Sequence, residues 1–156
     1  MHQVQLLIGS NIDPQQNIQA ALKMLESIHP FKACSRIWKT LAYENAGPDF
    51  LNIAISIETP LSMKEYKESV ISSIETNLKR QRFPDKNAPR TMDIDIIIFD
   101  GQVVDSGLWN KFFITVPLAD LLPKIKDPDS GKTLQQLAQG MLDQGLAVLY
   151  ANCLDA

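Results

Sequence analysis

The stretch DIDIIIF, from Asp93 to Phe99, constrains the fold of this chain most. Successive side chains of a strand point to opposite faces, so Asp93 and Asp95 share one face of a predicted strand. The opposite face carries Met92, Ile94 and Ile96. The residues at 96–99 are continuously apolar, as in a strand that is buried on both faces. Because carboxylates that enter such a strand are costly unless something pairs with them, we expect both aspartates to meet a partner.

Hydrophobic patterns elsewhere predict strands that alternate with helices. Leu51–Ile57 has apolar residues at every second position, and further strands are predicted at Val4–Ile8 and Phe31–Thr40. Asp13 can cap a helix that starts at Pro14 and keeps helical apolar spacing to Ile28. A second amphipathic helix runs from Ser62 to about Arg80. With the aspartate strand fourth, the order is β-α-β-β-α-β, which predicts an α+β, ferredoxin-like core.

The residues after this core predict additional C-terminal helices. A short helix is expected at Val116–Leu122, and Thr133 begins another, with Gln136 completing a capping box. The triplet Gly131-Lys132-Thr133 resembles the end of a phosphate-binding P-loop, but position 126 is lysine where that motif requires glycine. We therefore interpret the triplet as a turn followed by a helix cap.

A basic loop lies directly before the aspartate strand. Against a single acid, Asp85, it carries five cations: Lys79, Arg80, Arg82, Lys86 and Arg90. A wet strand face and a solvated helix end would each explain one half of this arrangement. Together they favour a site for a metal-bound polyphosphate, because magnesium prefers oxygen ligands and the planar guanidinium of arginine binds phosphate oxygens in two places.

Composition limits the function classes. At 156 residues and 45% hydrophobic, the chain is long enough for one domain, 1–156, with a sizeable core. A net charge of −3 implies no general affinity for nucleic acid or anionic membranes. Cys34 and Cys153 lie far apart without a CxxC motif, so we expect reduced thiols and no zinc site. With no charged-then-apolar leader and no run of about 18 apolar residues, the default is a cytoplasmic protein.

The segment Ala88–Ile97, APRTMDIDII, resembles the signature of the 6-hydroxymethyl-7,8-dihydropterin pyrophosphokinase family. Two further family matches fall in the expected order, at Gly9-Ser10-Asn11 and Asp49-Phe50-Leu51-Asn52. The resemblance covers residues 3 to about 100 and weakens thereafter. It implies transfer of pyrophosphate from ATP to the hydroxymethyl group of a pterin, with release of AMP, in folate biosynthesis.

The resemblance also implies a set of site residues. Asp93 and Asp95 would hold magnesium, expected as two ions, on ATP. Arg80 and Arg90 would neutralise the transferred group, and Glu75, Arg82 and Lys111 would contact the nucleotide, with Lys111 in place of a family arginine. The pterin would stack between Phe50 and Phe113, Asn52 would read its ring edge, and Thr40, Leu41 and Tyr43 would form the backbone wall. Glu75 as an ordinary exposed helix residue and Phe113 as a core residue remain alternatives.

Two departures from the family pattern keep other functions open. The connection Gln102–Lys111 is short and lacks the family histidine, and Asn87 replaces an aromatic residue of the basic loop, for which Trp109 is a candidate substitute. A non-catalytic relative that binds pterin or nucleotide is therefore the alternative to an enzyme. A nucleic-acid-binding module of the same fold class is disfavoured, since Phe31, Trp38 and Phe50 do not form its aromatic motif. We expect a monomer with two small-molecule substrates.

Overall fold

The computed structural model describes residues 1–41, 48–82 and 92–153, and side chains between 79 and 82 are outside this description. Its strands are β1 His2–Ser10, β2 Ala33–Cys34, β3 Ile37–Thr40, β4 Phe50–Thr59, β5 Asp93–Phe99, β6 Gln102–Val103 and β7 Ala147–Ala151. Its helical segments are α1 Pro14–Ile28, α2 Met63–Glu65, the π-helix η2 Tyr66–Ile71, α3 Ser72–Arg82, the 3-10 helix η3 Ser106–Trp109, α4 Phe112–Leu121 and α5 Leu134–Asp143.

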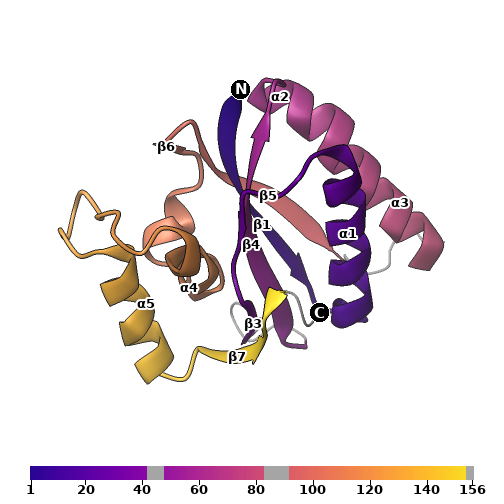
Figure 1. Ribbon diagram of the computed structural model, residues 1–156. Coiled ribbons are helices and arrows are strands. Elements are labelled where there is room, and N and C mark those ends of the chain that lie inside the picture. Colours follow the sequence, from indigo (N-terminus) through magenta and orange to yellow (C-terminus); the bar gives the residue numbers. More distant parts are fainter. Residues whose placement is uncertain (42–47, 83–91, 154–156) are drawn as a thin grey trace.

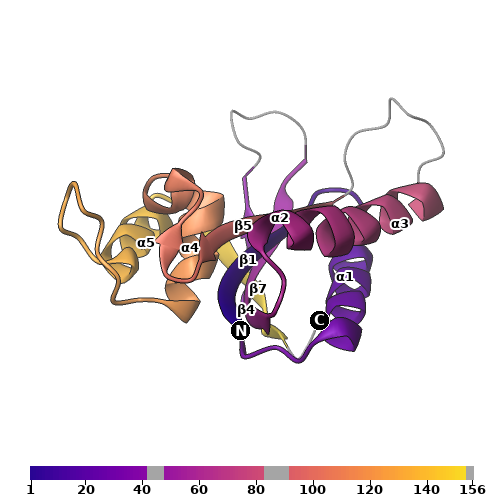
Figure 2. The same cartoon turned by 90° about the horizontal axis from the view of Figure 1, so that it is seen from above.

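The strands of the described residues form one antiparallel sheet that helices cover on both faces. The order along the sheet is β6-β5-β1-β4-β3-β7, and β2 pairs with β4 beside this path. Helices α1 and α3 lie on one face, and α4 and α5 lie on the other (Figures 1 and 2). The chain is therefore an α+β protein, and the aspartate strand β5 lies next to the central strand β1.

Each face of the sheet has its own hydrophobic core. Alternate residues of the central strands, such as Leu6 and Ile53, pack against α1 and the η2–α3 segment. On the other face, Leu7 and Ala54 pack against α4. The pairing of β1 with β5 shifts register between Gln5 and Leu6, which oppose Ile98 and Ile96 respectively. The extra residue is Ile97, and this bulge places Ile97 and Ile98 together in the α4-side core.

Several predicted elements have different boundaries in the structure. The strand expected at Phe31–Thr40 is split into β2 and β3, because Ser35 turns its hydroxyl to accept from Ala54 N (2.8 Å) and to donate to Arg36 O (2.7 Å). The helix expected at Val116–Leu122 begins at Phe112, so that Pro117 lies inside it. The helix from Ser62 includes the π-helix, and strands β6 and β7 were not predicted.

The helix caps agree better with the sequence-based predictions than the element boundaries do. Thr133 and Gln136 form the predicted capping box, and Gly131 has the positive φ of a turn, +72°. Asp13 precedes Pro14 as expected, but its φ of 42° is left-handed and its side chain makes no cap hydrogen bond. The triplet that resembles a P-loop is therefore a turn and cap, as interpreted from the sequence.

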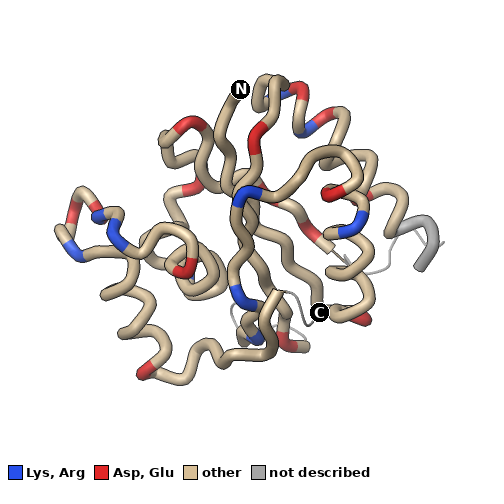
Figure 3. The backbone as a smooth tube through the Cα atoms, in the orientation of Figure 1, with Lys and Arg blue, Asp and Glu red and all other residues tan. Residues whose placement is uncertain are grey.

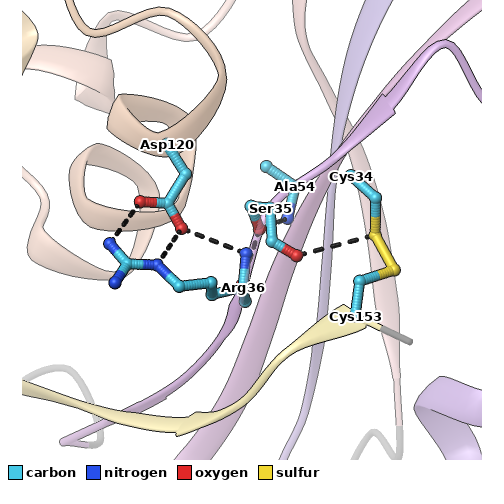
Figure 4. The surroundings of a disulfide bond; sticks show 6 residues. All are labelled: Cys34, Ser35, Arg36, Ala54, Asp120 and Cys153. Atoms are coloured by element: carbon cyan, nitrogen blue, oxygen red, sulfur yellow. Dashed lines mark hydrogen bonds and ion pairs between the residues drawn. A yellow bond between two sulfur atoms is a disulfide. The ribbon is translucent and has the colours of Figure 1, made fainter. Parts of the chain in front are cut away.

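The two cysteines form a disulfide, which contradicts the expectation of reduced thiols (Figure 4). The residues are 119 positions apart in sequence, yet their Cα atoms are 6.3 Å apart. Strand β7 causes this proximity: it pairs with β3 so that Ala151 opposes Ile37, and it thereby delivers Cys153 to the segment that holds Cys34. Sequence spacing could not reveal this pairing, because it depends on an unpredicted strand.

Within the described ranges, no helix has both the length and the apolar character needed to cross a membrane.

Candidate active site

Two cavities meet at the start of strand β5, and both are lined by Asp93 and Asp95. The first, about 230 Å³, lies between the sheet and α4, and its other lining residues are Leu7, Gly9, Leu41, Phe50, Asn52 and Phe113. The second, about 530 Å³, extends from η2 and α3 to the segment 104–106 and is largely polar; its lining includes Lys67, Ser72, Glu75, Asp105 and Ser106. Figure 3 shows acidic residues at the start of β5, beside α3.

Strand register explains how the floor of the first cavity forms. Gly9 of β1 lies between Asn52 of β4 and Asp93 of β5, because it opposes both in the two antiparallel pairings. A Cβ atom at Gly9 would lie 2.5 Å from Asn52 Oδ1. Glycine is therefore required here for the Asn52 amide to lie close against β1.

The amide of Asn52 is held in one orientation. Asn52 is buried, and its Nδ2 donates to Thr40 Oγ1 at 2.6 Å. Thr40, also buried, thus supports Asn52 from β3, and Leu41 follows it into the wall of the cavity. A fixed amide beside an apolar wall suits recognition of a flat ring with a polar edge.

Aromatic side chains enter the first cavity from two elements. Phe50 comes from the start of β4, and Phe113 comes from the first turn of α4, where its ring packs edge-on against Phe112 with centroids 5.7 Å apart. Helix α4 is fixed at this end by Thr115, whose hydroxyl donates to Leu108 O (2.7 Å) and Lys111 O (3.0 Å). Phe113 also packs against the α4-side core, as the alternative interpretation expected, and its role in stacking on a ligand remains a prediction.

Glu75 connects helix α3 to the aspartate strand. Its Oε2 accepts a hydrogen bond from the backbone N–H of Ile94 at 2.9 Å, between the two aspartates. Glu75 is therefore not simply a solvated helix residue. Its predicted contact with nucleotide remains a prediction, and its place in the lining of the second cavity is compatible with it.

The carboxylates of Asp93 and Asp95 suit a magnesium ion that keeps other ligands. Among the described residues, no group of three or more His, Cys, Asp or Glu side chains is placed to hold a metal. Magnesium, however, is commonly bound by one or two carboxylates together with waters and phosphate oxygens. Two aspartates on one strand face, bordering both cavities, are a donor set of that kind.

The remaining predicted site residues divide into two groups. Lys111 is the N-cap residue of α4. Its side chain packs against Gly107, where an added Cβ atom would lie 2.8 Å from Lys111 Cδ. Tyr43 and Arg90 lie outside the described residues, as do the side chains of Arg80 and Arg82. The structure therefore brings together the described residues that were predicted to bind metal and pterin, and the roles of these residues and of the arginines remain predictions.

The prediction from sequence missed residues in both cavities. Leu7 could have been found by alternation within the predicted first strand, whereas Gly9 follows the end of that predicted strand. Residues 104–106 belong to the short connection that was noted only as a departure from the family, yet they line the second cavity. Trp109, a candidate lid residue, instead packs against the α4-side core with Leu108 and Ile97.

The fold is shared with the HPPK-DHPS protein of Plasmodium falciparum, with a TM-score of 0.70 and 12% identity over 92% of this chain, which spans 41% of that one. Two pyrophosphokinases of 2-amino-4-hydroxy-6-hydroxymethyldihydropteridine are similar in sequence. The Synechocystis enzyme is 29% identical over 85% of this chain and 72% of its own, and the Pseudomonas aeruginosa enzyme is 29% identical over 94% and 96%.

A family model also matches residues 5–123, and its description is 7,8-dihydro-6-hydroxymethylpterin-pyrophosphokinase. The chain belongs to this family.

Proposed function

We propose that this chain transfers the pyrophosphoryl group of ATP to the hydroxymethyl oxygen of 6-hydroxymethyl-7,8-dihydropterin in folate biosynthesis. One observation carries the proposal beyond family membership: two cavities of different character border the same two carboxylates. Two substrates that occupied them would meet at Asp93 and Asp95. Bringing reactants together in this way removes most of the entropic cost of a bimolecular reaction.

The first cavity is assigned to the pterin. Phe50 and Phe113 offer faces for its ring, and offset stacking of this kind adds about 0.5–1.5 kcal/mol beyond the burial of area. The fixed amide of Asn52 offers both a donor and an acceptor to the polar ring edge. The hydroxymethyl group would then point toward the aspartates at the border of the cavity.

The second cavity is assigned to ATP. Lys67 supplies a cation to its lining, and Ser72 and Ser106 supply hydroxyl groups. The segment 79–90 begins in the last turn of α3, and its Arg80, Arg82 and Arg90 would supply the further cations that a triphosphate requires. Lys111, by resemblance to the family, adds a contact to the nucleotide.

Asp93 and Asp95 would hold magnesium, with two ions expected from the resemblance. When bound, the metal neutralises charge on the phosphate oxygens. The chain's own residues position the reactants: the hydroxymethyl oxygen forms a bond to the β-phosphorus while the bond from that phosphorus to the α-phosphate oxygen breaks. AMP leaves, the hydroxyl proton passes to solvent, and Arg80 and Arg90 neutralise the developing charge.

The proposal also includes the fold type, the domain organisation and the location of the protein. The strand order β5-β1-β4-β3 supports a ferredoxin-like βαββαβ core, to which the C-terminal elements are added. We take residues 1–156 as a single, monomeric domain that works in the cytoplasm on two small molecules.

The decisive test is to incubate the protein with magnesium-ATP and the pterin alcohol and to quantify AMP against ADP. Pterin-dependent AMP is the expected product. ADP in its place would indicate simple phosphoryl transfer, and a folded protein that binds pterin without forming AMP would be the non-catalytic relative. An Asp95→Ala variant serves as the control for contaminating activity.

A further inference from the structure

A hydrogen-bond network joins the last turn of helix α4 to the start of strand β3 (Figure 4). Asp120 Oδ2 accepts hydrogen bonds from Arg36 N (3.0 Å), Arg36 Nε (3.1 Å) and Trp38 Nε1 (3.0 Å). Asp120 Oδ1 accepts from Arg36 Nη2 at 2.8 Å. The Arg36 guanidinium also lies over the Trp38 ring, 4.7 Å from its centroid, and its bonds to Asp120 raise the pKa of Arg36.

The placement of this aspartate requires an explanation. A negative charge in the last turn of a helix opposes the helix dipole, so Asp120 is unfavourable for α4 in isolation. Its side chain is only 16% exposed. Four hydrogen bonds offset both costs, and charge-assisted bonds of this type are the stronger ones. The carboxylate therefore serves the contact between α4 and β3 rather than the helix itself.

The geometry of α4 links this contact to the first cavity. Phe113 and Asp120 are seven residues apart, which is about two helical turns, so they lie on nearly the same face with about 10.5 Å of rise between them. Strand β3 meets α4 at Asp120: Arg36 directly precedes the strand, Trp38 lies at its start, and Leu41 follows its end. From the contact at Asp120, β3 runs toward Leu41 and α4 runs back toward Phe113, and both of these residues line the cavity.

Pro117 makes the position of Phe113 depend on contacts outside the helix. It lies between Asp120 and Phe113, and as a proline it has no N–H to donate to the carbonyl of Phe113, four residues earlier. The helix backbone is therefore less constrained at this point, and tertiary contacts at both ends fix the axis of α4. Thr115 provides one of these contacts, and Asp120 provides the other.

We infer that Asp120 is a positioning residue for the pterin site: through Arg36 and Trp38 it sets the distance between Leu41 and Phe113 across the cavity. This inference rests on the proposed function, since the cavity it shapes is the one assigned to the pterin. It leaves the second cavity unaffected, because that cavity is formed by η2, α3, β5 and residues 104–106.

The test compares Asp120→Ala with Asp120→Asn. The asparagine keeps one side-chain oxygen, which can retain the three bonds that Oδ2 accepts, whereas alanine removes all four. Pterin binding is measured directly by calorimetry, and kcat and KM are measured for both substrates. For Asp120→Ala we expect the pterin Kd and KM to rise about tenfold, with kcat and the KM for ATP within about twofold. Asp120→Asn is expected to recover most of the affinity.

Asp100→Asn is the matched control. Asp100 likewise accepts from a backbone N–H, that of Gln3, and from a side chain, that of His2, but it lies at the other end of the sheet. In a Trp109→Phe background, Trp38 is the remaining tryptophan, and its fluorescence should change in Asp120→Ala and not in Asp100→Asn.

Equal pterin affinity in folded Asp120→Ala and wild type would overturn the inference, as would an equal loss of affinity for both substrates. Failure of the wild type to bind the pterin would instead remove the proposed function, and this inference with it.

Discussion

The two cavities beside β5 differ in how their walls are built. The first draws its walls from the central strands and α4, and its polar group, the Asn52 amide, is itself hydrogen-bonded inside the protein. The second draws its walls from η2, α3, β5 and the segment after β6, and charged and hydroxyl side chains make up most of its lining. A preorganised, mostly apolar wall selects a ligand by shape, whereas a polar wall recognises charge. Under the proposed function, substrate selectivity would reside in the first cavity, and charge neutralisation would take place at its border with the second.

Replacing a shared carboxylate should produce the largest effect, because it affects both cavities at once. Asp95→Ala is expected to lower pyrophosphoryl transfer by about 10³-fold, since metal-assisted neutralisation of phosphate charge is lost. Asp95 is exposed, so the fold should persist. The measurement is AMP release together with magnesium-dependent binding of ATP. An unchanged magnesium dependence would contradict the metal role.

Asp100→Asn is the control for Asp95→Ala. Asp100 follows the same strand and has a φ of 49°, a conformation that asparagine tolerates. It lies outside both cavities as lined by the described residues, so activity should remain within about twofold.

Filling the space at Gly9 should affect the first cavity and leave the second unchanged. In Gly9→Ala, the added methyl group would displace the Asn52 amide and disturb its bond to Thr40. We expect the KM for pterin to rise about tenfold, the KM for ATP to change little, and stability to fall by about 1–3 kcal/mol, as for other overpacked sites. Steady-state kinetics with each substrate varied in turn would show this. A parallel loss for both substrates would contradict the division of roles.

Gly140→Ala is the matched substitution for Gly9→Ala. Gly140 lies inside α5, and a Cβ there would have no neighbour within 4 Å. Alanine should therefore stabilise the protein by about 0.5–1 kcal/mol and leave both KM values unchanged.

The smallest effect is expected from His29, which lies at the end of α1, away from both cavities. Its Nε2 is 2.9 Å from Tyr66 Oη, and burial lowers the pKa of His29 below its ordinary value of 6.5. Because the unfolded chain then takes up a proton more readily than the folded one, the free energy of unfolding depends on pH through His29. The contribution of His29 to stability is fully present above about pH 6.5 and decreases as the pH falls toward the folded pKa.

A His29→Gln variant should remove this part of the pH dependence. Denaturant unfolding between about pH 7.5 and about pH 5.5 measures the slope, and kinetics at about pH 7.5 should be unchanged for both substrates. His2→Gln, which replaces the chain's other histidine, is the control and should keep the slope that His29 causes. Retention of that slope in His29→Gln would show that other groups cause it.

The parts of the site that are local in sequence could be predicted. Asp93 and Asp95 share a strand face because of simple alternation, and Asn52 was placed correctly by the strong period of two in β4. Leu7 was missed although the same alternation reveals it. The role of Gly9 depends on strand pairing: only the register of β1 with β4 and β5 shows that this glycine faces both Asn52 and Asp93.

The features that were not predicted depend on contacts between distant residues. Strand β7 exposes Val148, Leu149 and Tyr150, so its sequence lacks the alternation that signals a half-buried strand. The split of the second strand depends on Ser35 meeting Ala54, and the network of Asp120 depends on α4 crossing β3. No pattern within one segment contains this information. The roles of Arg80 and Arg90 rest on resemblance alone.

The disulfide makes a closed covalent ring of the chain between Cys34 and Cys153. Both aspartates, Asn52 and Phe113 belong to this ring, so a single cut in its backbone would leave one covalently joined molecule until the disulfide is reduced. Strand β1 is outside the ring, yet it lies between two of its strands, β4 and β5. The ring therefore keeps the pieces of the site together but does not align them. Alignment depends on β1, a strand outside the ring that pairs with β4 and β5 of the ring.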